Sequence, residues 1–197
     1  MQLIFATQNK NKVHEIQCQL KKEFKISTLE ALNHHEDLEE TQDTLEGNAL
    51  QKSNFIWEKY GLNVFADDTG LEVEALNGAP GVYSARYAGQ AKSFQDNIDK
   101  LLKNMESYTN RKARFRTIIS LIIEGEKHFF EGICEGEITY TQSGEEGFGY
   151  DPIFKPKGYE ETFAEMDLEL KNKIGHRGKA VEKLVEFLNS QMTITKD

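Results

Sequence analysis

Residues 64–70 read Val-Phe-Ala-Asp-Asp-Thr-Gly, and this stretch decides how the rest of the chain is interpreted. The apolar triplet 64–66 is typical of a buried strand, and two acidic residues follow it directly. Ligands of open α/β sheets bind beyond the carboxyl ends of the strands, so Asp67 and Asp68 are expected at a ligand site. Adjacent carboxylates are costly to bury without a cation or hydrogen-bond donors, and Mg²⁺ bridges carboxylates to phosphates. The alternative is a tight turn with local side-chain capping.

The segments before this stretch predict an α/β fold. Residues 3–6 form a short apolar run typical of a strand. Apolar residues at helical spacing follow at Val13, Ile16 and Leu20. A second amphipathic helix is predicted over 48–60, ended by Gly61. A strand-helix-strand order of this length predicts parallel strand pairing.

The segments after it indicate a different arrangement. Residues 113–124 and 128–138 are rich in Ile, Phe and Thr, and a short turn sequence separates them, which predicts an antiparallel hairpin. Helices are predicted over 94–105 and 177–188. The chain is therefore expected to fold as a mixed sheet flanked by helices.

The charge balance argues against two classes of partner. The 197 residues contain 24 Lys and Arg against 33 Asp and Glu, a formal net charge of −9. A negative protein has little general affinity for nucleic-acid backbones or anionic membranes. The sequence also lacks a run of about 20 apolar residues, which a membrane helix requires. We expect a cytoplasmic protein that binds neither nucleic acid nor membrane, and whose polyanionic ligand requires a local basic pocket.

Residues 7–12 are a candidate phosphate-binding loop. They lie where a strand passes into a helix, so free backbone N–H groups and the positive helix end are available to a phosphate, and Lys12 adds a charge. The segment lacks the glycines of a Walker loop. It is also typical of an ordinary polar loop with an Asn or Thr N-cap and solvated lysines.

Three further segments carry groups that suit a nucleotide, and each has a simpler reading. The acidic run 36–43 is typical of a solvated surface, although one of its members can reach the same metal. Residues 144–152 combine loop glycines with two aromatic rings, which suits stacking on a base but equally a turn whose aromatics enter the core. Lys171 and residues 176–179 form a basic island at the start of the last helix, where cations are either ligands or merely solvated.

Taken in order, these segments resemble the inosine/xanthosine triphosphate pyrophosphatase family, the non-standard purine NTP pyrophosphatases or XTP/dITP diphosphatases. Each motif is modest alone, but their ordered combination is specific and spans nearly the whole chain. The motifs are Thr-x-Asn-x-x-Lys at 7–12, Ala-Asp-Asp-Thr-Gly-Leu at 66–71, Gly-Ala-Pro-Gly-Val-Tyr-Ser-Ala-Arg-Tyr at 78–87, Phe-Gly-Tyr-Asp-Pro-Ile-Phe at 148–154 and His-Arg-Gly at 176–178.

The resemblance implies a fold, an activity and a set of site residues. It implies one nucleoside triphosphate pyrophosphatase domain over 1–197, with two lobes, the active site in the cleft between them, a Mg²⁺ cofactor and a homodimer. The implied reaction converts ITP, dITP or XTP to the nucleoside monophosphate and pyrophosphate, which cleanses the nucleotide pool. The implied metal ligands are Glu40, Asp67 and Asp68, with Asp68 also the catalytic proton acceptor. The implied substrate contacts are Thr7, Asn9, Lys12, Thr69, Phe148, Gly149, Tyr150, Asp151, Lys171, His176 and Arg177.

Some positions depart from the family pattern or stay open. Thr69 stands where many relatives carry Ser and keeps the hydroxyl, whereas Gly47 stands where many carry Glu. The alignment near Glu40 leaves Glu39 as a competing metal ligand. A nucleotide-binding regulatory module and a magnesium phosphatase releasing orthophosphate are the rival functions; a proton acceptor beside a metal ligand argues against the first, and the reaction products distinguish the second.

Overall fold

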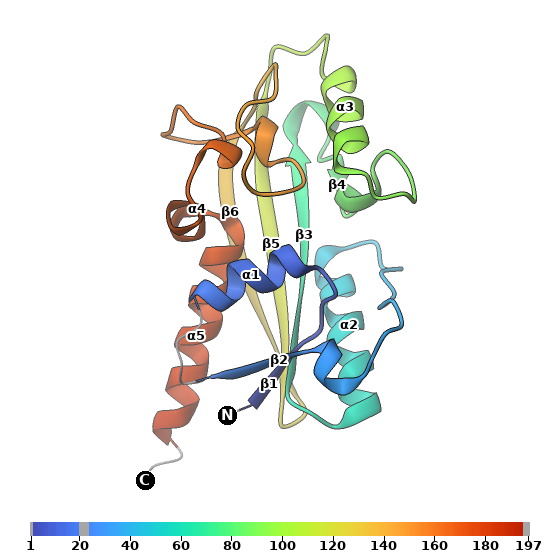
Figure 1. Ribbon diagram of the computed structural model, residues 1–197, viewed down its shortest axis with the longest axis vertical. Coiled ribbons are helices and arrows are strands. Elements are labelled where there is room, and N and C mark those ends of the chain that lie inside the picture. Colours follow the sequence, from blue (N-terminus) through green and yellow to red (C-terminus); the bar gives the residue numbers. More distant parts are fainter. Residues whose placement is uncertain (1, 20–23, 195–197) are drawn as a thin grey trace. The chain divides into compact units, whose positions relative to one another are not determined.

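The computed structural model describes residues 2–19 and 24–194. The chain divides into two compact units, and neither unit is a single continuous segment. Unit 1 comprises Met1–Asp68, Thr117–Gly132 and Arg177–Asp197, and unit 2 comprises Thr69–Arg116 and Ile133–His176. Figure 1 follows the chain through its helices and strands.

The described residues form a mixed sheet of seven strands. Six lie in the order β2-β1-β3-β5-β6-β7, and β4 pairs with β3. β1 is parallel to both β2 and β3, whereas β4 is antiparallel to β3 and β7 is antiparallel to β6. The strands are β1 (Gln2–Phe5), β2 (Lys25–Thr28), β3 (Val64–Val73), β4 (Pro80–Gly81), β5 (Lys112–Ile123), β6 (Glu126–Ile138) and β7 (Phe154–Pro156). The predicted mixed sheet and its parallel pair are confirmed.

Helices flank this sheet, as predicted. The α-helices of the described residues are α1 (Lys10–Gln19), α2 (Leu45–Tyr60), α3 (Phe94–Asn104), α4 (Leu168–Ile174) and α5 (His176–Ile194). Short 3₁₀ turns, η1 to η5, lie at Leu29–Leu32, Glu74–Leu76, Ser84–Arg86, Asp151–Ile153 and Phe163–Glu165. Among residues 2–19 and 24–194, no helix combines the length and the hydropathy that a membrane span requires.

Most predicted elements are found close to their expected positions. α2 starts three residues earlier than predicted because Thr44 caps it, and it ends at Gly61, which has φ 64°. The turn between β5 and β6 consists of Glu124 and Gly125, both with positive φ, which is typical of a tight hairpin turn and agrees with the prediction. Leu20, which the prediction placed on the first helix, lies outside the described residues.

One prediction about β3 is wrong. The strand does not end at residue 66 but continues through the acidic pair to Val73, so Asp67 and Asp68 lie inside a strand rather than beyond its carboxyl end. The alternative of a tight turn at these residues is wrong as well. Charged side chains inside a strand are tolerated here because both are buried among charged and polar partners, described below.

Unit 1 has three layers. One sheet face packs against α1 and α5 in a cluster of Leu3, Phe5, Ile16, Phe24, Phe65, Ile119, Leu121, Ile123, Ala180, Val181, Leu184 and Leu188. The opposite face packs against α2 in a cluster of Ile4, Ala6, Leu29, Ile56, Val64, Ala66 and Ile122. Successive residues of β1 and β3 alternate between the two clusters, as the period of two in a strand requires.

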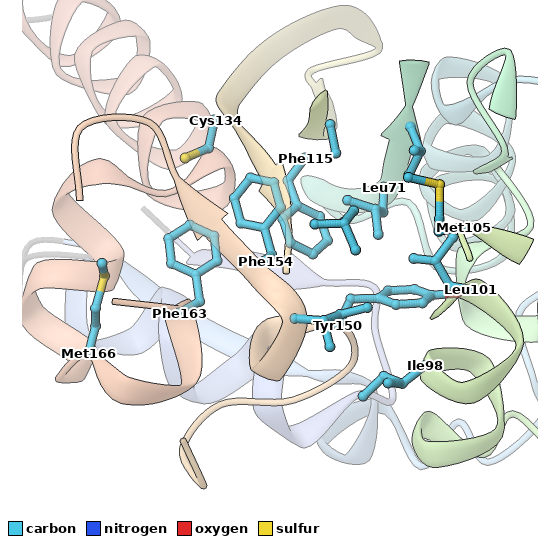
Figure 2. Packing of buried hydrophobic residues seen from close by; sticks show 14 residues of the cluster. Leu71, Ile98, Leu101, Met105, Phe115, Cys134, Tyr150, Phe154, Phe163 and Met166 are labelled. Atoms are coloured by element: carbon cyan, nitrogen blue, oxygen red, sulfur yellow. The ribbon is translucent and has the colours of Figure 1, made fainter. Parts of the chain in front are cut away.

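Unit 2 has an aromatic core of its own, shown in Figure 2. The ring of Phe115 on β5 meets Phe154 at 4.6 Å, and Phe154 lies 5.1 Å from Phe163. Leu101 and Met105, at the end of α3, are fully buried in the same cluster. This core fixes β7 and the loop before it, which carries the Phe-Gly-Tyr-Asp motif.

Candidate active site

Asp67 and Asp68 project from opposite faces of β3. Phe65 belongs to the cluster beneath α1 and α5, whereas Ala66 belongs to the cluster beneath α2. Side chains alternate along a strand, so Asp67 lies on the α1/α5 face and Asp68 on the α2 face. Both are buried, at 1% and 7% exposure. The two carboxylates therefore have different partners.

Asp67 is enclosed by cations. Lys12 Nζ lies 3.0 Å from each carboxylate oxygen, and Arg177 Nε lies 3.3 Å from Oδ2. Arg177 also pairs with the buried Glu15. Burial would raise the pKa of Asp67, but the positive charges of Lys12 and Arg177 outweigh it and hold that pKa far below its ordinary value. Asp67 is therefore ionised throughout the physiological pH range.

Asp68 has a different environment. Asn48 Nδ2 donates to its Oδ2 at 3.0 Å, and Lys52 Nζ lies 3.8 Å from its Oδ1. Burial raises the pKa of Asp68 above its ordinary value, although Lys52 opposes the shift. A carboxylate with a raised pKa is a stronger base, which suits a proton acceptor.

Lys52 links Asp68 to Glu40. Its ammonium lies 2.6 Å from Glu40 Oε1 and donates to the backbone oxygen of Asp67 at 2.8 Å. Burial would lower the pKa of Lys52, but Asp68 and Glu40 together raise it. The competing ligand Glu39 is exposed, so the geometry favours Glu40 as the member of the acidic run that reaches this cluster.

Lys52 and Asn48 were missed by the sequence reasoning, although a signal was present. They are four residues apart on α2, and both are buried beside Ala49, Ser53 and Ile56. Residues at this spacing lie on one helix face. A lysine and an asparagine on a buried helix face require buried partners, and here those partners include carboxylates.

The 7–12 loop begins α1. Asn9 Oδ1 accepts from the backbone N–H groups of Asn11 and Lys12 at 3.0 and 3.3 Å, and Thr7 Oγ1 accepts from the N–H of Asn9 at 3.2 Å. The N-cap reading of this loop is confirmed. Lys12, however, is not solvated: its side chain is 13% exposed, and burial lowers its pKa despite the opposing Asp67. Phosphate binding by the loop stays a prediction.

In unit 2, Asp151 organises the Phe-Gly-Tyr-Asp loop. Its Oδ2 accepts from the backbone N–H of Phe148 at 2.7 Å and from Lys171 Nζ at 2.6 Å. The Lys171 ammonium also lies 5.0 Å from the centre of the Phe148 ring. Gly147 leaves room for this carboxylate, which a Cβ at that position would strike. Asp151 is thus a bridge between the loop and α4.

The two aromatic residues of this loop differ. Tyr150 enters the core, where its hydroxyl donates to Ser84 O at 2.9 Å, and burial raises its pKa. The core reading is confirmed for Tyr150. Phe148 is only half-buried and remains a candidate for base stacking.

Three other residues singled out from the sequence take clear positions. His176 is 5% exposed, and its ring stacks on Phe115 at 4.5 Å and 18°. Thr69 is half-buried on β3. Gly47 is in the first turn of α2, where its N–H donates to Thr44 Oγ1 at 3.0 Å. A Cβ at Gly47 would lie 2.7 Å from Gln42 Cβ, so Glu at this position requires that Gln42 shifts.

Glu40 and Asp68 of unit 1 carry carboxylates that could hold a magnesium ion together with phosphate oxygens and waters. Among residues 2–19 and 24–194, no three His, Cys, Asp or Glu side chains form a ready-made metal site. Mg²⁺ commonly uses one or two carboxylates together with phosphate oxygens and waters. Glu40 and Asp68 supply two carboxylates that already share one cation, the Lys52 ammonium. Both oxygens of Asp67 are engaged by Lys12, and one also by Arg177.

Comparisons with known proteins identify the family to which this chain belongs. The Ham1 family model matches residues 3–187. A Flavobacterium johnsoniae protein named dITP/XTP pyrophosphatase is 56% identical over 190 residues, which cover 96% of this chain and 99% of the relative. A Porphyromonas gingivalis protein of the same name is 52% identical, over 94% of this chain and 96% of its own. The solved Ham1 protein of Staphylococcus aureus superposes with a TM-score of 0.89 at 39% identity, covering 97% of this chain and all of that one. The chain belongs to the Ham1 family.

Proposed function

We propose that this protein hydrolyses non-standard purine nucleoside triphosphates, namely ITP, dITP and XTP, to the nucleoside monophosphate and pyrophosphate. The observation that carries the proposal is the largely buried charge cluster in which Asp68 and the half-buried Glu40 share Lys52 while Lys12 and Arg177 meet Asp67. Relatives that carry the dITP/XTP pyrophosphatase name match over nearly their whole length. We also propose that residues 1–197, which include both units, act as one functional domain.

The reaction requires a base and concentrated positive charge. Asp68 accepts the proton of a water whose oxygen attacks the α-phosphorus; the bond from that phosphorus to the α–β bridging oxygen breaks, and pyrophosphate leaves with the bond electrons. Lys12, in the first turn of α1, and Arg177 stabilise the negative charge of the polyphosphate. Asp67 holds both cations in place through its oxygens.

The proposed cofactor is Mg²⁺, held by Glu40 and Asp68. When bound, it supplies positive charge to phosphate oxygens and lowers the pKa of a coordinated water. The resemblance implies Asp67 as a third ligand, but its oxygens meet Lys12 and Arg177, so we propose a different role for it. Asp67 then contributes through these cations.

Base selection is assigned to unit 2. Hypoxanthine and xanthine carry a carbonyl at C6, where adenine carries an amino group. The backbone N–H groups of Gly149 and Tyr150 and the ring of His176 are the proposed donors to that carbonyl, and Lys171 holds the loop through Asp151. A site built around a required hydrogen bond rejects the wrong base by about 10⁴-fold or more, because buried groups are left unpaired. Guanine shares the carbonyl, so its exclusion requires that the 2-amino group finds no partner.

A product assay tests the function. Purified protein is incubated with Mg²⁺ and each of ITP, dITP, XTP, GTP and ATP, and both products are identified. Pyrophosphate with the monophosphate supports the proposal. Orthophosphate would instead indicate a phosphatase, tight binding without turnover a regulatory module, and equal kcat/KM for GTP and ITP would remove the selectivity.

Two wider proposals accompany this function. The family resemblance supports a homodimer, which light scattering coupled to gel filtration tests directly. A role in cleansing the nucleotide pool places the protein in the cytoplasm, and fractionation of cells with an antibody against the chain tests that location.

A further inference from the structure

Phe94 is a half-exposed aromatic residue next to the proposed base site. It is the first residue of α3 and 45% exposed, and its ring lies 6.1 Å from that of Phe148 at a tilt of 43°. A single exposed apolar side chain requires no explanation by itself. Here, however, its aromatic neighbour is the ring proposed to stack on the purine.

The backbone at Phe94 is held firmly. Ser93 caps α3 by accepting from the N–H of Asp96 at 3.3 Å. The side chain of Asn97, only 2% exposed, donates to Ala85 O at 3.1 Å and accepts from the N–H of Ala88 at 2.6 Å. The first turn of α3 is therefore fixed to η3 and to the residues just after it.

The loop that carries Phe148 depends more on side-chain contacts. Gly147 and Gly149 flank it with φ of 77° and 65°, a conformation in which glycine gives the backbone little resistance to rotation. Asp151 holds the Phe148 N–H, and the Lys171 ammonium lies over the ring. Phe94 adds an aromatic contact from a rigid helix end, so the orientation of the ring is set by α3 as well as by α4.

We propose that Phe94 is a positioning residue for purine binding: it packs against Phe148 and keeps that ring in the orientation that stacks on the base. This inference rests on the proposed function. It assigns Phe94 no contact with the triphosphate and no part in the chemical step. Its loss should therefore weaken the binding of the base while the rate of hydrolysis at saturation is retained.

The test compares steady-state kinetics of Phe94→Ala with wild type. KM for ITP should rise about threefold to tenfold, the range that corresponds to losing one aromatic pair, with kcat within about twofold. Inhibition by inorganic tripolyphosphate, which has no base, should be unchanged. Phe94→Tyr keeps the ring and should retain the wild-type KM. Phe129→Ala is the matched control, because Phe129 is 47% exposed and belongs to the unit 1 part of β6.

A double mutant shows whether Phe94 acts through Phe148. In a Phe148→Ala background, Phe94→Ala should change KM no further. An unchanged KM in the single variant, an additive rise in the double variant, or an equal rise in the tripolyphosphate inhibition constant would each overturn the proposal. If Phe94→Ala does not fold, Phe94→Leu keeps apolar bulk without the ring and gives the same comparison.

Pyrophosphate release by the wild-type protein distinguishes a failure of this inference from a failure of the proposed function. If wild type releases no pyrophosphate from ITP, dITP or XTP, the proposed function fails and the role of Phe94 fails with it. If wild type turns over ITP and Phe94→Ala keeps the wild-type KM, only the role of Phe94 is rejected.

Discussion

Asp67 and Asp68 are adjacent in the sequence but lie on opposite faces of β3, one between Lys12 and Arg177 and the other beside Asn48 and Lys52. This arrangement divides the acidic pair into a carboxylate that holds cations and a carboxylate available as a base. The two residues should therefore respond differently to the same substitution.

Asp68→Asn should remove most catalysis. If Asp68 accepts the proton of the attacking water, kcat for ITP should fall by about two to four orders of magnitude, because the amide is no base. Pyrophosphate release under saturating substrate and Mg²⁺ measures the effect. Turnover within a few-fold of wild type would reject Asp68 as the base.

Asp67→Asn should mainly destabilise the fold. The amide leaves Lys12 and Arg177 without their shared anion in a buried position, and breaking a buried ion pair typically costs about 3–5 kcal/mol. Urea unfolding followed by circular dichroism gives the free energy of unfolding. Asp68→Asn is the matched control and should lose less. Equal losses of unfolding free energy in the two variants would contradict the different roles of Asp67 and Asp68.

The two carboxyl groups should titrate on opposite sides of the ordinary aspartate value of 3.8. In the metal-free protein, the Asp67 pKa lies below it because of Lys12 and Arg177, and the Asp68 pKa lies above it because of burial. Carbon NMR of labelled carboxyl groups measures both midpoints. Two midpoints on the same side of 3.8 would contradict the assigned environments.

Because the two pKa values shift in opposite directions, the two groups change the stability of the fold in opposite directions as the pH falls. A depressed pKa means that the unfolded chain binds the proton more tightly, so the contribution of Asp67 is complete above pH 3.8 and decreases as the pH falls toward its folded pKa. For Asp68, the folded chain binds the proton more tightly. Its contribution to stability therefore increases as the pH falls through the folded pKa toward 3.8.

Glu40→Gln should weaken Mg²⁺ binding, and Glu39→Gln should not. Glu40 shares Lys52 with Asp68, whereas Glu39 is exposed. Losing a ligand should reduce Mg²⁺ affinity by at least about tenfold, since even groups behind the ligands commonly contribute that much. Calorimetric titration with Mg²⁺ in the presence of nucleoside monophosphate and pyrophosphate measures it. A larger loss of Mg²⁺ affinity in Glu39→Gln than in Glu40→Gln would show that Glu39, and not Glu40, is the metal ligand.

The elements that depend on local pattern could be predicted from the sequence. The end of α2 at Gly61 and the β5–β6 turn follow from glycine at positive φ, and the apolar runs predict β1 and the start of β3. The extension of β3 through the acidic pair could not be predicted, because the pattern there shows only charge. What permits the extension is remote: Lys12 and Arg177 lie 55 and 110 residues from Asp67.

The candidate site was predictable as a list of residues but not as an arrangement. The ordered motifs indicate Asp67, Asp68, Lys12 and Arg177 individually, yet the period of two that separates the acidic pair becomes visible only once β3 is known to run through it. Lys52 was missed because a lysine on a helix is usually solvated. The face of α2 that carries Lys52 becomes buried only when the helix packs on the sheet, and the local sequence does not reveal this packing.

Both units are assembled from separated stretches of chain, three in unit 1 and two in unit 2. No single cut can therefore liberate either one as an intact fragment. A truncation after residue 116 would remove from unit 1 its parts of β5 and β6 and the helix α5 that packs in the cluster of Phe65, and from unit 2 the strand β7. Deletion mapping, the usual route to a minimal binding module, is therefore unsuited to this molecule. Each of the two units needs stretches from both halves of the chain.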